Sequence, residues 1–102
     1  METEVIQSDK QLLKIAVSGK LDANEVGNHA WQLYGLLNNC KTPVILDLSG
    51  VSFLSSLGIR MLITAAKDIQ RSGHSLKIEN PSPEAEKVIR MAGLDELITP
   101  LG

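Results

Sequence analysis

The sequence predicts an α/β fold: a mixed, mostly parallel sheet of four to five strands, with helices packed against it and a β-hairpin at its amino end. Along the 102 residues, short apolar runs alternate with helical periodicities in the order β-β-α-β-α-β-α-β, which favours right-handed crossovers onto a parallel sheet. Residues 44–48 are almost uniformly apolar, as in a strand covered on both faces. There is no internal repeat, low-complexity tract or linker, so we expect residues 1–102 to form a single domain.

The first part of the chain predicts a hairpin followed by a helix. Residues 4–7 form a weak strand pattern and residues 12–18 a stronger one, with a turn signal around Asp9 between them. Asp22 and Glu25 stand three positions apart before an apolar period, an arrangement that caps the start of a helix. The buried face of that helix is expected to consist of Val26, Ala30, Leu33 and Leu37.

The middle of the chain predicts a strand, a long helix and a second strand. After the apolar strand at residues 44–48, residues 57–72 carry an apolar side and an opposite polar stripe, as in a helix that lies on a core. Gly73 is placed to end this helix. A short strand is expected at residues 75–79.

The last part of the chain predicts a third helix and a final strand. Ser82 and Pro83 fit the N-cap and first position of the helix, and Gly93 fits its end. Residues 96–99 are expected to form the last strand. The side chains expected to point inward from the helix are Val88, Ile89 and Met91.

Composition excludes several classes of function. Ten Lys and Arg against twelve Asp and Glu leave no basic surface for a phosphate backbone, and 3% aromatic residues offer few platforms for base stacking. The core must therefore be aliphatic. The lone Cys40 can make no internal disulfide, no Cys/His cluster has metal-ligand spacing, and no nucleotide-binding glycine loop occurs. With neither a signal peptide nor an apolar run of membrane-spanning length, we expect a cytoplasmic protein without cofactor, membrane insertion or direct nucleic-acid binding.

The segment between the apolar strand and the second helix is the most informative. Ser55 and Ser56 fall at the start of a helix, where unpaired N–H groups and the positive dipole end favour an anion. Phosphorylation there would create a switch, whereas in the simpler interpretation one serine is only the N-cap. Catalysis by Ser56 would need a general base, and neither His29 nor His74 belongs to a recognisable pairing, so we expect no enzyme.

Three further residues carry expectations. Asp22 would share the carboxyl edge of the sheet with Ser56 and could join a recognition surface there, or it could serve only as a helix cap. Asp47 is expected to hydrogen-bond a neighbouring loop, because a buried carboxylate needs partners. Phe53, three residues before Ser56, is expected to anchor the loop in the core.

Four motifs together resemble those of the STAS domain, the fold of anti-sigma factor antagonists and of sulfate-transporter tails. Their order and spacing match across essentially the whole chain, and the resemblance implies a four- to five-stranded sheet with packed helices. The motifs are Gly19-Lys20-Leu21-Asp22, Val44-Ile45-Leu46-Asp47-Leu48-Ser49-Gly50-Val51, Phe53-Leu54-Ser55-Ser56-Leu57-Gly58-Ile59 and Met91-Ala92-Gly93-Leu94.

The resemblance also implies a site. In the antagonists, the serine after an aspartate in this loop is phosphorylated by a partner anti-sigma factor serine kinase, and Ser56 takes that position, with Ser55 as the less favoured acceptor. Two residues depart from the pattern: Ser55 replaces the aspartate and Leu57 replaces a small residue. The residues expected to meet the partner are Asp22, Ser55, Ser56, Leu57, Gly58 and Arg60.

Two functions follow from the resemblance. The first is a non-enzymatic regulator, similar to an anti-sigma factor antagonist, that binds a serine kinase and is switched at Ser56. The alternative is a STAS scaffold or accessory subunit that docks on a transporter ATPase or a signalling assembly without being phosphorylated, which Ser55 and Leu57 favour. In isolation we expect a monomer.

Overall fold

The computed structural model describes residues 1–99. Five strands, three α-helices and a short 3₁₀ helix follow one another along these residues. Their bounds are β1 Glu2–Ser8, β2 Leu13–Leu21, α1 Ala23–Leu37, β3 Val44–Asp47, β4 Val51–Leu54, α2 Ser56–Arg71, β5 Leu76–Glu79, α3 Pro83–Met91 and the 3₁₀ helix Asp95–Leu97.

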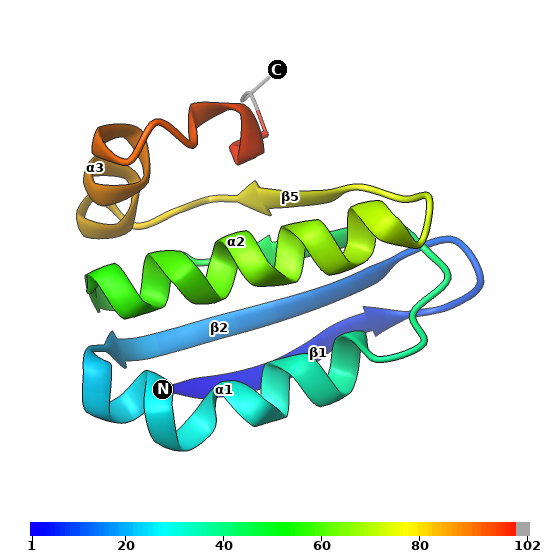
Figure 1. Ribbon diagram of the computed structural model, residues 1–102, viewed down its shortest axis with the longest axis horizontal. Coiled ribbons are helices and arrows are strands. Elements are labelled where there is room, and N and C mark those ends of the chain that lie inside the picture. Colours follow the sequence, from blue (N-terminus) through cyan, green and yellow to red (C-terminus); the bar gives the residue numbers. More distant parts are fainter. Residues whose placement is uncertain (100–102) are drawn as a thin grey trace.

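The sheet is mixed and mostly parallel, as predicted. Its main path runs β1-β2-β3-β5, and β4 also pairs with β2. Only β1 is antiparallel to its neighbour, which confirms the amino-terminal hairpin (Figure 1). Strand β2 therefore has three partners: β1 on one side, and β3 followed by β4 on the other.

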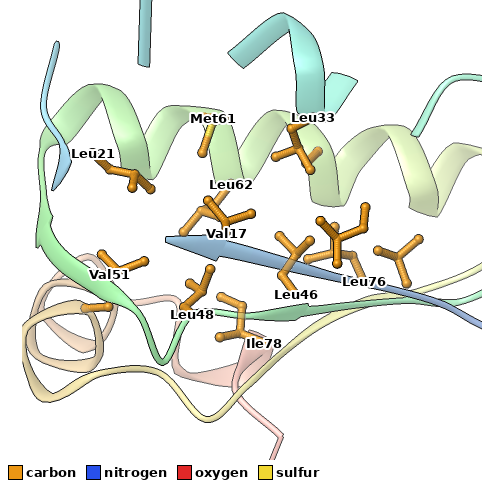
Figure 2. Close-up of a cluster of buried hydrophobic side chains, with 14 of the residues drawn as sticks. Val17, Leu21, Leu33, Leu46, Leu48, Val51, Met61, Leu62, Leu76 and Ile78 are labelled. Atoms are coloured by element: carbon orange, nitrogen blue, oxygen red, sulfur yellow. The ribbon is translucent and has the colours of Figure 1, made fainter. Parts of the chain in front are cut away.

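The helices α1 and α2 lie next to each other across one face of the sheet (Figure 1). Alternate side chains of the strands point into the space beneath them, so that Ile15 and Val17 are fully buried while Lys14 and Ala16 are only half-buried. Figure 2 shows the cluster that results, with Leu33 of α1 and Met61 and Leu62 of α2 above it. The core is aliphatic, which confirms the expectation from composition.

The sequence does not predict strand β4, which lies in the segment that joins the strand expected at residues 44–48 to the helix expected from residue 57. It pairs with the last three residues of β2, just beyond the stretch that β3 covers. The backbone turns between β3 and β4, where Gly50 accepts a hydrogen bond from the N–H of Gly19 at 2.9 Å. A Cβ atom on Gly50 would lie 2.8 Å from Cβ of Ser18, so this close approach requires glycine.

Two expectations for the carboxyl end are wrong. Residues 96–99 do not form a strand: a 3₁₀ helix occupies Asp95–Leu97, and Ile98 makes a single parallel bridge to Ile78. Met91 does not point inward, and its side chain is 78% exposed. Two residues along an α-helix correspond to a rotation of about 200°, so Met91 lies opposite the buried Ile89.

The predicted helix boundaries are largely confirmed. Asp22 and Ser82 cap α1 and α3 by accepting from the N–H groups of Glu25 and Ala85. Ser82 also donates to the carbonyl of Val51 at 2.6 Å, which ties α3 to β4. Gly73 and Gly93 follow the carboxyl ends of α2 and α3 with positive φ, as helix-ending glycines do.

Gly50 is tightly packed and Gly27 is not, so substitution by alanine should change the free energy of unfolding in opposite directions. Gly50→Ala should lower the free energy of unfolding by about 1–3 kcal/mol, because its Cβ would collide with Ser18. Gly27→Ala, in the interior of α1 with open space around the new Cβ, should raise it by about 0.5–1 kcal/mol. Chemical denaturation measures both, and a stabilising Gly50→Ala would contradict the packing described for β4.

The hairpin turn predicts a pH dependence. The carboxylate of Asp9 accepts hydrogen bonds from the N–H groups of Gln11 and Leu12 and from the amide of Gln7, at 2.8–3.0 Å. These hydrogen bonds lower the pKa of Asp9, and the bond from the N–H of Gln11 has the largest effect. A carboxyl whose pKa is lowered on folding stabilises the protein above its unfolded pKa, and this contribution is lost as the pH falls through the folded pKa.

Asp9→Ala should therefore be less stable than the parent at neutral pH, and the difference should shrink on acidification. Thermal unfolding of both proteins from neutral pH to about pH 2 checks this. A difference that stays constant over that range would contradict a stabilising role of the ionised Asp9.

Candidate functional site

The site forms where the carboxyl end of β2 meets the amino end of α2. The carbonyl of Leu21, the last residue of β2, accepts two hydrogen bonds from Ser55: one from its N–H at 3.0 Å and one from its hydroxyl at 2.7 Å. Asp22 follows Leu21 directly and caps α1. The amino ends of α1 and α2 therefore lie at the same edge of the sheet, as Figure 1 shows at the arrowhead of β2.

The two neighbouring serines have different roles. Ser55 is the N-cap of α2: its hydroxyl oxygen accepts from the N–H of Gly58 at 3.2 Å while donating to Leu21, and the residue is half-buried. Ser56 is the first residue of the helix and is exposed. The capping role is thus taken by Ser55, which leaves the hydroxyl of Ser56 at the surface.

The amino end of α2 differs in charge from those of the other two α-helices. Its first turn contains no acidic residue, whereas α1 has Glu25 and α3 has Glu84 and Glu86 in that position. Carboxylates in the first turn compensate the positive end of the helix dipole. In α2 no acidic residue of the helix compensates the positive end of the dipole, so a negatively charged group beside Ser56 would be stabilised there.

Gly58 is buried rather than exposed. A Cβ atom there would lie 2.6 Å from Cδ1 of Leu54 and 3.3 Å from the carbonyl of Leu21, so glycine lets the first turn of α2 approach β2. Burial corrects the expectation that Gly58 meets a partner directly. Leu57 is half-buried against the core, and Arg60, further along α2, is exposed.

Asp22 is held at the edge by its own cap interaction. Its Oδ1 accepts from the N–H of Glu25 at 2.8 Å, and its Oδ2 lies 4.0 Å from Nζ of the exposed Lys20. The side chain of Glu25 does not complete a reciprocal cap, because it turns toward the amino group of Met1 and toward His29. The second carboxylate oxygen of Asp22 therefore remains near the surface beside Lys20.

The expectation that Phe53 anchors the loop in the core is wrong. Its side chain is 47% exposed, whereas Val51 and Leu54 are buried. The pairing of β4 with β2 is irregular between Gly19 and Lys20, so the inward and outward alternation shifts there and Phe53 pairs with the exposed Lys20. Sequence reasoning missed both as surface residues, although each lies within one of the matching motifs.

The two histidines occupy places other than the first turn of α2. His29 faces Glu25 in α1, and His74 follows the opposite end of α2, about 24 Å along a helix of 16 residues. Within residues 1–99, no group of His, Cys, Asp and Glu side chains is arranged to hold a metal ion. Asp47 accepts from the N–H of Ser49 at 2.9 Å, which confirms its expected bond to a neighbouring loop, although its side chain is half-buried and not buried.

None of the helices in residues 1–99 combines the length and the apolar character needed to cross a membrane.

Known structures with the same architecture include anti-sigma factor antagonists. The chain matches SpoIIAA in its unphosphorylated form with a TM-score of 0.79 and 18% identity over 96% of this chain and 86% of that one. An antagonist from Mycobacterium paratuberculosis matches with a TM-score of 0.79 and 18% identity, over 97% and 86% of the two chains. SLC26A9 matches with a TM-score of 0.62 and 19% identity, over 92% of this chain but only 19% of that one.

At these identities the likeness is one of fold. The family itself is shown by the sequence, because the model of the STAS domain matches residues 1–101. The chain therefore belongs to the STAS domain family.

Proposed function

We propose that this protein is a non-enzymatic regulator resembling the anti-sigma factor antagonists, which binds an anti-sigma factor serine kinase in the cytoplasm and is switched by phosphorylation of Ser56. The observation that carries the proposal is that the two serines have different roles. Ser55 caps α2, and Ser56 presents its hydroxyl at the surface. The family and the antagonists among its structural relatives support it.

A phosphate on Ser56 would meet a favourable local environment. It would lie in the first turn of α2, where backbone N–H groups lack helical acceptors and the helix itself contributes no acidic residue. The N–H of Gly58 already bonds Ser55, so those of Ser56 and Leu57 are the ones left for a phosphate. The phosphate would add about two negative charges at the edge of the sheet that also bears Asp22, enough to weaken binding to a partner that fits the unphosphorylated surface.

Ser55 is the poorer acceptor. Its hydroxyl is half-buried and makes two hydrogen bonds, one to Leu21 and one from Gly58. Phosphorylation would break the bond it donates to the Leu21 carbonyl and bring negative charge against that oxygen. Ser55 thus performs the capping function of the aspartate that the family motif has here, but without its charge.

The partner surface that we propose combines exposed and half-buried residues around Ser56. Asp22 and Lys20 contribute a close pair of opposite charges, Phe53 an apolar ring and Arg60 a further positive charge. An exposed aromatic ring surrounded by polar groups is typical of the centre of a protein interface.

A second candidate function is docking without phosphorylation, on a transporter ATPase or a larger signalling assembly. The absence of an acidic residue at position 55 favours it, because the motif of the switched antagonists is incomplete. The occurrence of the same fold as a part of the much longer SLC26A9 chain is consistent with such a role.

The two serines provide a matched test of the switch. On incubation with a cognate anti-sigma factor kinase and ATP, the parent and Ser55→Ala should be phosphorylated at Ser56, and Ser56→Ala should not be. Ser55→Ala should lose about 0.5–2 kcal/mol of stability through its missing cap, whereas Ser56→Ala should stay within about 0.5 kcal/mol of the parent. Phosphopeptide mapping and denaturation measure these outcomes.

Absence of phosphate from both serines, with kinase binding retained, would eliminate the switch. Loss of kinase binding as well would eliminate the proposed function, and recovery of a transporter component from the source cell would favour the second candidate.

Substitution of Phe53 tests partner binding with little change in stability. Because its side chain is half-exposed, Phe53→Ala should change the unfolding free energy by about 1 kcal/mol or less, yet raise the Kd for the kinase about tenfold or more. Trp31→Ala, which removes an exposed aromatic ring from the outer side of α1, is the matched control and should leave this Kd unchanged. Equal Kd values for the parent and Phe53→Ala would remove Phe53 from the interface.

A further inference from the structure

The outer side of α1 carries an unusual surface. Trp31, the only tryptophan of the chain, is 67% exposed there. Gly27 and Gly35 lie one helical turn before and after it, on the same side of the helix. A large aromatic ring, whose indole N–H donates to the carbonyl of Asn28 at 3.0 Å, is thus exposed between two positions that have no side chain.

Nothing within the described part of the chain explains these glycines. Neither has positive φ, and a Cβ atom at either position would meet no atom within 4 Å. Glycine in the interior of a helix costs about 0.5–1 kcal/mol relative to alanine. A close approach from outside the molecule would account for their presence.

The same surface lacks charge. Residues 26–40 contain no Asp, Glu, Lys or Arg, although 22% of the whole chain is charged. The exposed sides of α2 and α3, by contrast, include Arg60, Lys67, Glu84 and Lys87. Depletion of charge together with an exposed tryptophan is characteristic of interface centres.

A hollow lies beside Trp31, between α1 and the edge strand β1. Its lining is mostly apolar: Val5, Gly35, Leu36 and Trp31, together with the polar side chains of Thr3 and Gln32. Val5 is a further exposed apolar side chain, at 42% exposure. One surface therefore contains both a projecting aromatic ring and an apolar depression.

We propose that α1 is the interface of a symmetric dimer in which Trp31 of each copy occupies the hollow at Gly35 of the other. In an antiparallel pair of helices with the two-fold axis between these positions, Trp31 faces Gly35 of the second copy and Gly35 faces its Trp31. A two-fold interface must be complementary to itself, and the projecting ring and the hollow on one face meet that requirement.

The absence of charge also points to a second copy, and the size of the face sets the strength of the contact. A face without formal charge can meet its own copy without bringing like charges together, which would cost free energy. α1 is about 22 Å long and about 10 Å wide, so its face is well below the ~800 Å² per partner of a standard interface. The dimer is consequently weak. The protein is a monomer at low concentration, as expected from the sequence, and dimerises only at high concentration.

The test combines sedimentation velocity with tryptophan emission over protein concentrations from about 1 µM to about 1 mM. The sedimentation coefficient of the parent should rise from that of a monomer to that of a dimer. Because Trp31 is the only tryptophan, its emission should shift to shorter wavelength over the same concentrations as the ring becomes buried. A parent protein that remains monomeric up to about 1 mM, or one that dimerises without this shift, would overturn the proposal.

Variants locate the interface. Trp31→Ala should remain monomeric throughout, and Gly35→Gln should raise the dimer Kd at least tenfold by filling the hollow, without lowering the thermal midpoint. The matched control is Met91→Ala, which removes another exposed apolar side chain and should dimerise like the parent. Dimerisation of Trp31→Ala or Gly35→Gln with the parent Kd would also overturn the proposal.

Discussion

The pair of hydrogen bonds from Ser55 to the carbonyl of Leu21 is the contact on which the site depends. It joins the end of the central strand β2 to the start of α2, at the residue where α1 is about to begin. The start of α2, which is distant in sequence, is thereby held at the edge of the sheet where β2 ends and α1 begins. The buried Gly58 makes the approach possible, since a side chain there would collide with Leu54.

The order of elements was predictable because it depends on local patterns. Alternation in β2, helical periodicity in α2 and the caps at Asp22 and Ser82 can each be recognised within a few residues. Strand β4 was not, because its four residues pair correctly only when Gly50 fits against Ser18, a contact between distant segments. Likewise, the interruption of pairing next to Lys20 determines that Phe53 faces outward.

The candidate site was predictable as a region but not residue by residue. The sequence placed two hydroxyls at a helix start, yet identical neighbours offer no local signal for which one becomes the cap. That choice depends on which hydroxyl reaches Leu21 across 34 positions of sequence. The same limit applies to Gly58, whose burial follows from the packing of α2 on β2.

The rigid setting of Ser56 bears on how an acceptor of this kind is recognised. An extended peptide loses conformational entropy when it binds an enzyme, whereas a hydroxyl on the first turn of a packed helix has already lost it on folding. Recognition then depends on a surface assembled from β2, β4 and α2, not on a linear string of residues. A short synthetic segment around Ser56 would lack that surface, so specificity for this serine would require the folded domain.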